Sequence, residues 1–329
     1  QAGKGKTRAV LVARFTRLQK NKPESKLDPR PLILAPTREL VVQTCADAEG
    51  LGAVCPFKVQ AIFGGVDYEK QRKALQDGVD IIVATPGRLI DLVKRKAVDL
   101  SHVKTVILDE ADEMMSMGFK TQLDEILTHL SRVENRWLFS ATMPQEIMQI
   151  IKRHFSPSAH KIEVSGRNVV NKNIQHQFLI CEDNEKLNIL IQFLKSEQKN
   201  RGVVFCKIKA SAQVLAKQLI AKNIPTDAIH GDLKQIERDK VMRAFKNESL
   251  RILVATDIAA RGIDIVDLSF VVHYELPDKE EYYTHRSGRT ARAGKEGVSL
   301  ALVNNKELKN LRYFQKTLNI AFNQIRPRK

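Results

Sequence analysis

Val106-Ile107-Leu108-Asp109-Glu110-Ala111-Asp112 is the stretch that decides the fold. Its apolar residues do not alternate with polar ones, and they run straight into a cluster of carboxylates. This pattern predicts a short strand, buried on both faces of a parallel sheet, with the carboxylates at its carboxyl end. Open α/β sheets bind ligands at that edge, where a carboxylate suits Mg²⁺ beside the phosphates of a nucleotide. An ordinary strand followed by an acidic helix N-terminus is the alternative interpretation.

The overall composition favours an anionic partner. Lys and Arg number 54 against 38 Asp and Glu, a net charge of +16, which points to nucleic acid first and to a basic, solubilising surface second. The 329 residues suffice for two domains, and no apolar run approaches the ~18 residues of a membrane span. Cysteines without C-x-x-C spacing argue against a zinc site or a disulfide framework and favour a reduced, cytoplasmic setting: Cys45, Cys55, Cys181 and Cys206.

The chain opens on Gln1-Ala2-Gly3-Lys4-Gly5-Lys6-Thr7, which matches the last seven positions of a P-loop. Such a loop closes backbone N–H groups around phosphates, while its lysine reaches the β- and γ-phosphates and its hydroxyl holds Mg²⁺. A helix is predicted over residues 8–18, with its N-terminus towards the anion. The strand that normally leads into a P-loop is missing from this sequence, so we expect an N-terminally truncated fragment. A flexible glycine-rich terminus is the alternative.

Three further predicted strands end in small, hydroxyl-bearing or basic residues. Apolar runs at 31–35, 59–63 and 81–84 lead into Pro36-Thr37-Arg38-Glu39-Leu40, Gly64-Gly65 and Thr85-Pro86-Gly87-Arg88. Small residues allow a close approach to the backbone, and Thr, Arg and amide N–H groups suit phosphate oxygens. Each end taken alone could be an ordinary connection with an N-cap threonine. Three of them on one sheet edge favour a track for a polyanion.

Trp137-Leu138-Phe139-Ser140-Ala141-Thr142 repeats this design. Trp137 has apolar neighbours, so we expect it in a core rather than as a platform for base stacking. Ser140 and Thr142 are expected to link the acidic cluster to whatever moves when a nucleotide binds.

The hydrophobic periodicity lapses between His160 and Asn173, which predicts a linker there. Beyond it the alternation of strand and helix resumes, with strands expected at 202–206, 227–232, 251–255 and 270–274. Near the end of this half, Arg289 and Arg292 lie three residues apart and share one face if the segment is helical. A solvated basic helix face is the alternative for this pair.

Taken in order, these motifs resemble the series that defines the DEAD-box RNA helicases, from the first residue to about Gly294. Each motif is weak alone, the ordered set is specific, and the second half is similar to bacterial members. The motifs are Gly5-Lys6-Thr7, Pro36-Thr37-Arg38-Glu39-Leu40, Gly64-Gly65, Thr85-Pro86-Gly87-Arg88, Asp109-Glu110-Ala111-Asp112, Ser140-Ala141-Thr142, Ala255-Thr256-Asp257 with Arg261-Gly262-Ile263-Asp264, and His285-Arg286 with Gly288-Arg289 and Arg292.

The resemblance implies an α/β fold with two tandem RecA-like parallel-sheet domains, of the P-loop NTPase kind in helicase superfamily 2. The ATP-binding domain would span 1–162 without its first strand and its upstream adenine-reading segment. A linker at 163–173 and a C-terminal helicase domain at 174–329 would follow. The implied cofactors are ATP and Mg²⁺. The implied partner is RNA, single-stranded or duplex, read without sequence preference, with no membrane and with protein partners that the sequence does not identify.

The resemblance also implies roles for individual residues. Catalysis would involve Lys6, Asp109, Glu110, Arg289 and Arg292, with Glu110 acting on the attacking water and the two arginines on the γ-phosphate. The nucleotide would be bound by Gly3, Gly5, Lys6, Thr7, Gly262 and Asp264, and Mg²⁺ by Thr7 and Asp109. RNA would be bound by Pro36, Thr37, Arg38, Gly65, Thr85, Arg88, Gly231, Gln235, Arg238, Thr256 and Arg261. Ser140, Thr142 and His285 would couple the domains.

The sequence leaves three functions open. An RNA-dependent ATPase and helicase follows from the ordered motifs. An RNA-binding clamp with negligible turnover follows from the missing N-terminal strand, and a DNA-directed helicase of the same superfamily is a third reading. Departures from the family pattern lie at Ala2 and Lys4 in the first motif, and at Ser287 and Ala291 in the last motif, at positions that do not carry its arginines.

Overall fold

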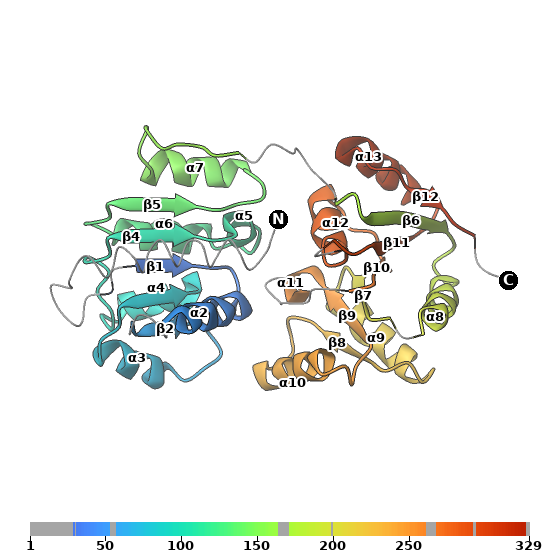
Figure 1. The fold of residues 1–329 in the computed structure, drawn as a ribbon, viewed down its shortest axis with the longest axis horizontal. Helices are drawn as coiled ribbons and strands as arrows, with labels where there is room; N and C mark the ends of the chain where they lie inside the picture. Colours follow the sequence, from blue (N-terminus) through green and yellow to red (C-terminus); the bar gives the residue numbers. More distant parts are fainter. Residues whose placement is uncertain are drawn as a thin grey trace. The chain divides into compact units, whose positions relative to one another are not determined.

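The predicted acidic-ended strand is β4 (Thr105–Leu108), and all four of its residues are buried. It belongs to a computed structural model that describes residues 29, 31–52, 57–163, 171–198, 200–260, 268–291 and 294–326. The chain forms two units, 1–162 and 163–329, and each is an α/β unit (Figure 1). None of the described helices combines the length and the hydropathy that crossing a bilayer would require.

The sheet of the first unit is parallel throughout and has the strand order β2-β3-β1-β4-β5. Besides β4 its strands are β1 (Pro31–Leu34), β2 (Val59–Ile62), β3 (Ile81–Ala84) and β5 (Asn135–Leu138). The helices are α2 (Arg38–Gly52), α3 (Tyr68–Gln76), α4 (Pro86–Lys94), α5 (Ala111–Ser116), α6 (Lys120–Thr128) and α7 (Gln145–His154). The predicted strands are confirmed to within a residue or two.

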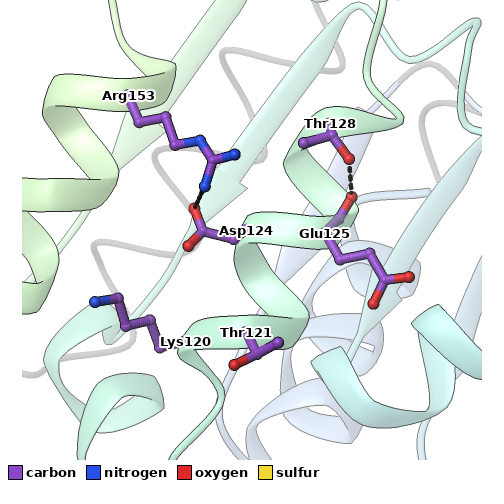
Figure 2. A pocket seen from close by; sticks show the side chains of 6 residues that line it. All are labelled: Lys120, Thr121, Asp124, Glu125, Thr128 and Arg153. Atoms are coloured by element: carbon purple, nitrogen blue, oxygen red, sulfur yellow. Dashed lines mark hydrogen bonds and ion pairs between the residues drawn. The ribbon is translucent and has the colours of Figure 1, made fainter.

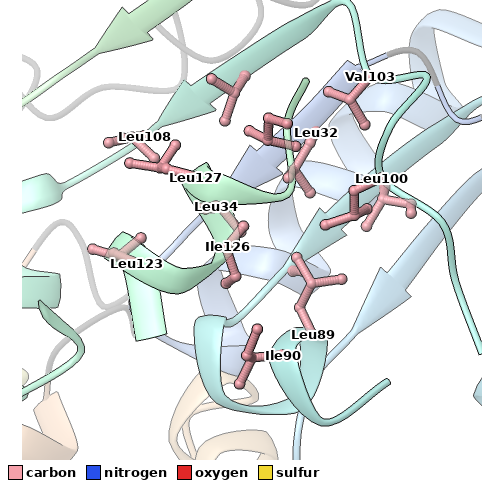
Figure 3. Packing of buried hydrophobic residues seen from close by; sticks show 14 of the residues in the cluster. Leu32, Leu34, Leu89, Ile90, Leu100, Val103, Leu108, Leu123, Ile126 and Leu127 are labelled. Carbon is pink, nitrogen blue, oxygen red and sulfur yellow. The ribbon is translucent and has the colours of Figure 1, made fainter. Parts of the chain in front are cut away.

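Side chains that alternate along β1 build two cores, one on each face of this sheet. Leu32 and Leu34 pack with residues of α4, α5, α6 and α7, and Figure 3 shows this cluster around Leu89, Leu123 and Ile126. The intervening Ile33 packs on the other face with residues of α2. Because both faces are covered, a run of consecutive apolar residues is what this sheet requires.

Trp137 lies on β5, partly buried against the α2-side core and edge-on to Phe139, with 6.4 Å between ring centroids. The residue therefore packs against a core, as expected, without being fully buried in it.

The second unit has a sheet with the order β12-β6-β11-β10-β7-β9-β8, and its paired strands are parallel. The strands are β6 (Ile174–Ile180), β7 (Gly202–Cys206), β8 (Thr226–Ile229), β9 (Ile252–Thr256), β10 (Phe270–His273), β11 (Gly297–Val303) and β12 (Asn323–Gln324). The helices are α8 (Lys186–Ser196), α9 (Lys209–Ile220), α10 (Gln235–Lys246), α11 (Asp257–Ala260), α12 (Glu280–Ser287) and α13 (Leu308–Leu318).

Helices cover both faces of this second sheet too. Residues of α8 and α9 form the core of one face, and residues of α10 to α13 form two clusters on the other. Cys206 is fully buried in the first of these cores, as expected for a core thiol. The two parallel α/β sheets predicted from the sequence are therefore confirmed.

Candidate functional site

The carboxyl ends of the five strands described in the first unit lie at one edge of the sheet, because these strands are parallel. The sheet's hydrogen bonds continue one residue beyond the strands: Ala35 N donates to Ala84 O (3.0 Å), Asp109 N to Leu34 O (2.9 Å) and Phe139 N to Leu108 O (2.8 Å). This edge brings together the predicted site residues that follow the strands, namely Pro36, Thr37, Gly65, Thr85, Asp109, Glu110 and Ser140. We predicted this shared position from the sequence, because these residues follow predicted parallel strands.

Asp109 and Glu110 follow β4, which lies between β1 and β5 in the sheet. Asp109 is 6% exposed and its Oδ1 accepts the N–H of Glu110 at 3.1 Å. Glu110 is the N-cap residue of α5 and has φ 52° and ψ 53°, in the left-handed region, while its side chain does not cap the helix. That conformation costs a residue with a Cβ roughly 1–2 kcal/mol. Strain of this kind gathers where function requires a fixed geometry, so it supports a functional role for Glu110.

Asp112 ties the acidic strand end to the segment that follows β5. Ser140 Oγ accepts the N–H of Asp112 at 3.1 Å and donates to the carbonyl of Thr142 at 2.6 Å. The Oδ2 oxygen of the Asp112 carboxylate accepts both the N–H (2.8 Å) and the hydroxyl (3.0 Å) of Thr142. The expected link from Ser140 and Thr142 to the acidic cluster thus runs through Asp112, to which the sequence had assigned no role of its own.

The two threonines that follow β1 and β3 differ. Thr37 Oγ1 accepts the N–H of Leu40 at 3.3 Å, so the plain N-cap interpretation describes it. Thr85 is the N-cap residue of α4, yet its side chain makes no capping hydrogen bond, and Pro86 stands in the first helical turn. The Thr85 hydroxyl is therefore not needed to begin the helix.

The two arginines on this edge are held by aromatic rings. The Arg38 guanidinium lies over the Phe63 ring, 4.8 Å from its centroid. The Arg88 guanidinium donates to the carbonyl of Val66 at 3.2 Å and lies 5.9 Å from the centroid of Tyr68. Buried Gln71 fixes the strand end beside them by pairing with the N–H and the carbonyl of Phe63, both at 3.1 Å. Both guanidinium groups thus have specific contacts beside the strand ends.

A separate open depression of about 600 Å³ lies on α6 and α7 of the first unit (Figure 2). It is lined by both charge signs, and Arg153 pairs with Asp124 across it at 3.7 Å. None of the residues predicted for the site lines it: the lining is Lys120, Thr121, Asp124, Glu125, Thr128 and Arg153.

In the second unit the predicted RNA residues that the structure describes gather where β8 and β9, which are neighbours, end. Gly231 follows β8 and is exposed, Thr256 ends β9, and Gln235 and Arg238 lie in the first turns of α10. Arg238 donates to the carbonyl of Ala259 at 2.7 Å, which joins α10 to α11. Gln235 donates to Asp239 at 2.7 Å on its own helix.

Arg286, to which the sequence assigned no role, is the largest fully buried side chain described. Its guanidinium makes two hydrogen bonds to the Asp257 carboxylate, at 2.6 and 2.7 Å, and a third to the carbonyl of Glu275 at 2.8 Å. It also lies 5.1 Å from the centroid of Phe205. This two-point ion pair joins α12 to α11, beside Thr256. A signal was present in the sequence, since Asp257 and Arg286 each adjoin a residue that was singled out.

Arg289 and His285 stand at the carboxyl end of α12, both partly exposed. The N–H of Arg289 donates to the carbonyl of Arg286 at 3.1 Å and that of Thr290 to Ser287 at 3.2 Å, which forms a tight turn. The remaining predicted residues lie outside the described ranges: Gly3, Gly5, Lys6, Thr7, Arg261, Gly262, Asp264 and Arg292.

Two buried histidines of the second unit are held neutral. Burial lowers the pKa of His176 to about 4. Burial lowers the pKa of His273 well below its usual value, and the charges of Arg286 and a protonated His176 act in the same direction. The ring nitrogens that face away from Tyr283 and the serines beside it, Nε2 of His176 and Nδ1 of His273, are buried without a hydrogen-bond partner. A second proton on either ring would thus create a buried charge with an unpaired donor.

The stability of the second unit is expected to fall as the pH drops below about 6.5. In the unfolded chain these histidines take up protons there, whereas the folded unit keeps them neutral until the pH approaches the lowered pKa values. For His176 the loss between pH 6.5 and pH 4 amounts to about 3 kcal/mol. Hydrogen exchange of the β10 and β11 amides, corrected for the intrinsic pH dependence of exchange, measures this loss within the second unit.

Two substitutions test that origin. His176→Gln should make the pH dependence shallower, and His160→Gln, at an exposed position, should leave it unchanged. An identical pH dependence in all three proteins would show that other groups control it.

Comparison with known proteins places these units among helicases. Residues 1–150 match the family model described as DEAD/DEAH box helicase, and residues 185–294 match the helicase conserved C-terminal domain. The DEAD-box ATP-dependent RNA helicase CshA of Geobacillus kaustophilus is 38% identical over 327 residues, which cover 99% of this chain and 69% of the relative. The ATP-dependent RNA helicase DbpA of Bacillus subtilis is 37% identical over 305 residues, 92% of this chain and 62% of the relative.

A solved structure of S. cerevisiae Dbp5 bound to RNA and ADP BeF3 matches with a TM-score of 0.87 at 30% identity. The match covers 99% of this chain and 83% of that one. The chain therefore spans roughly two thirds of the length of the curated relatives and most of this solved one.

Proposed function

The chain belongs to the DEAD-box family of ATP-dependent RNA helicases, and we propose that it couples ATP hydrolysis to single-stranded RNA binding and to local unwinding or remodelling of RNA duplexes. The observation that carries this proposal is the first unit's sheet edge. There Asp109 and Glu110 lie together with the strand ends whose small and hydroxyl-bearing residues suit phosphate oxygens. The fold class of tandem RecA-like units agrees with the match to a DEAD-box structure. The ATP-binding domain is proposed to span residues 1–162, the linker residues 163–173, and the C-terminal helicase domain residues 174–329.

The nucleotide would be ATP, with its phosphates bound by Gly3, Gly5, Lys6 and Thr7. Mg²⁺ would be held by Thr7 and Asp109, and when bound it neutralises phosphate charge. The donor set fits this ion, because protein-bound Mg²⁺ is usually held by one or two carboxylates together with phosphate oxygens and waters.

Glu110 is proposed to orient the attacking water and to receive its proton. Its neighbour Asp109 is fixed by the sheet, and the left-handed backbone holds Glu110 at the start of α5 in one geometry. Hydrolysis of a phosphoanhydride depends more on positioning and charge neutralisation than on covalent chemistry. Arg289 and Arg292 would supply positive charge to the γ-phosphate, and Gly262 and Asp264 would contact the nucleotide.

RNA is proposed to bind across the strand ends of both units. In the first unit the contacts are Pro36, Thr37, Arg38, Gly65, Thr85 and Arg88, and in the second Gly231, Gln235, Arg238, Thr256 and Arg261. Contacts to phosphates and 2′-hydroxyls read RNA without reading its sequence. Ser140, Thr142 and His285 would couple nucleotide to RNA, and linkage requires that RNA tightens ATP binding by the factor by which ATP tightens RNA binding.

Steady-state ATP hydrolysis with and without single-stranded RNA tests the proposal. We expect RNA to stimulate turnover, and competition by DNA of equal sequence to be weak. Nucleotide-dependent RNA binding without stimulation would instead support an RNA clamp. Equal competition by DNA would contradict recognition of the 2′-hydroxyl.

Because the buried cysteines described are free thiols, we also propose a cytoplasmic location.

A further inference from the structure

The buried face of α12 is polar, which is unusual for a helix that packs on a sheet. Tyr283, Arg286 and Ser287 are the buried residues of this helix, and their spacing of i, i+3 and i+4 places them on one face. Each is at most 1% exposed. Directional hydrogen bonds, and not apolar contacts alone, therefore hold the rotation and the height of α12 on the sheet.

Ser299 of β11 is the centre of the network beneath this face. Its hydroxyl lies 2.9 Å from the Ser287 hydroxyl, 3.1 Å from the Tyr283 hydroxyl and 3.1 Å from Nε2 of His273. His273 Nε2 also lies 3.3 Å from Ser287 Oγ, and His176 Nδ1 lies 2.7 Å from the Tyr283 hydroxyl. The His273 ring stacks on Tyr283, with 4.4 Å between centroids and 15° between planes.

One arrangement of protons pairs every imidazole N–H of this cluster. His176 donates from Nδ1 to Tyr283, Tyr283 donates to Ser299, and His273 donates from Nε2 to the serines. A hydroxyl has one donor and two acceptor positions, so Ser299 accepts from Tyr283 and His273 and donates to Ser287. Both imidazoles are then neutral, and the imidazole nitrogens that remain unpaired are acceptors, which costs less than leaving buried imidazole N–H donors unpaired.

From this network the backbone leads directly to Arg289. The carbonyls of Arg286 and Ser287 accept the N–H groups of Arg289 and Thr290, so the turn is built on the last residues of α12. On its far side, the Thr290 hydroxyl donates to the carbonyl of Leu268, and the two residues form a bridge.

The start of β11 approaches the turn closely. A Cβ added to Gly297 would lie 2.0 Å from Thr290 Oγ1 and 2.8 Å from Ala291 N. Arg289 therefore stands between two anchored neighbours, Ser287 and Thr290. Ala291, which ends the turn, has φ 56°, in the left-handed region.

We propose that Ser287, Ser299 and His273 are positioning residues for Arg289: their buried hydrogen bonds fix the end of α12 so that the Arg289 guanidinium meets the γ-phosphate in a productive geometry. This inference rests on the proposed function. It adds residues that contact neither nucleotide nor RNA and that act only through the backbone of the turn.

The test uses Ser287→Ala and Ser299→Ala in the whole protein. Alanine is a better helix former than serine, so the first variant should keep α12 intact. We expect kcat for RNA-stimulated ATP hydrolysis to fall by about tenfold or more, since a misplacement of ~1 Å can cost about 10²-fold. The KM for ATP and the affinity for RNA should change by less than about twofold, because the effect concerns the transition state.

Thr226→Val is the matched control. Thr226 is a buried residue of β8 in the same sheet, and its hydroxyl has no hydrogen-bond partner. Its removal should leave kcat unchanged. A fall in kcat for Thr226→Val as large as that for Ser287→Ala would overturn the proposal, because hydroxyl loss anywhere in the core would then suffice.

A double-mutant cycle with Arg289→Ala completes the test. If Ser287 acts through Arg289, Ser287→Ala should cost nothing further in the Arg289→Ala protein. Multiplicative losses would overturn the inference, as would a normal kcat for both serine variants beside an impaired Arg289→Ala. If Arg289→Ala itself kept full turnover, the proposed role of Arg289 would fail, whatever the serine variants do. Thermal unfolding of each variant identifies any loss that comes from unfolding.

Discussion

Glu110→Gln is expected to bind ATP and RNA as the parent protein does and to lose ATP hydrolysis almost completely. The amide keeps the size and the polarity of the carboxylate but cannot accept the proton of the attacking water. Loss of a general base typically lowers the rate by about 10²–10⁴-fold. Single-turnover hydrolysis measures the chemical step, and binding of a labelled nucleotide and a labelled RNA measures the two affinities. Because the variant still binds RNA but does not hydrolyse ATP, it should remain bound to RNA for longer than the parent protein.

The left-handed backbone at Glu110 sharpens this prediction. Gln has the same Cβ and the same backbone preferences, so the strain at φ 52° is unchanged and the fold should be as stable as before. Glu146→Gln, at an exposed position in the first turn of α7, is the matched control and should hydrolyse ATP normally. Turnover of the Glu110→Gln protein at the parent rate would refute the role assigned to this carboxylate.

Arg292→Ala should lower turnover by at least about 10²-fold at matched nucleotide occupancy, and Arg289→Ala should do the same. An arginine that stabilises the charge of the transferring phosphoryl group contributes about 10³–10⁵-fold. Arg292→Lys should restore only part of the rate, because an ammonium keeps the charge but lacks the planar fork that pairs with two phosphate oxygens. Measurement at saturating ATP separates this loss from weaker binding.

Arg312→Ala is the control for both arginines. Arg312 is exposed on α13, and its removal changes the net charge by the same amount. If the Arg312→Ala protein loses as much turnover as the Arg292→Ala protein, the effect is one of general charge on RNA binding. If Arg292→Ala unfolds the second unit, as thermal unfolding would reveal, the residue is structural and its role in hydrolysis is rejected.

Local patterns in the chain sufficed to predict the sheets and the site edge. A strand buried on both faces must be apolar along its whole length, so a strand at Val106-Ile107-Leu108 could be predicted from these residues alone. The residue after such a strand must lie at the sheet's carboxyl edge, which is why Asp109, Thr85 and Pro36 could be placed together from the sequence. The same reasoning put Trp137 and Cys206 into cores.

The pairings at the site depended on the tertiary structure. Asp112 meets Ser140 and Thr142 across 28 and 30 residues, and Arg286 meets Asp257 across 29. No short-range pattern encodes such contacts, because they arise only when strand register and helix docking bring two distant segments to one place. Thr37 and Thr85 each lie between a strand and the helix that follows it, yet only the Thr37 side chain accepts an N–H of its helix.

The sequence thus specified which chemistry lies at the ends of the parallel strands, since burial and chain direction are properties of each short segment. It did not specify the polar network under α12. His176, His273 and Ser299 lie on β6, β10 and β11, and nothing in their local sequence marks them. They join one hydrogen-bond network only because these three strands are neighbours in the sheet. Strand order is a property of the whole fold, and the geometry around Arg289 depends on it.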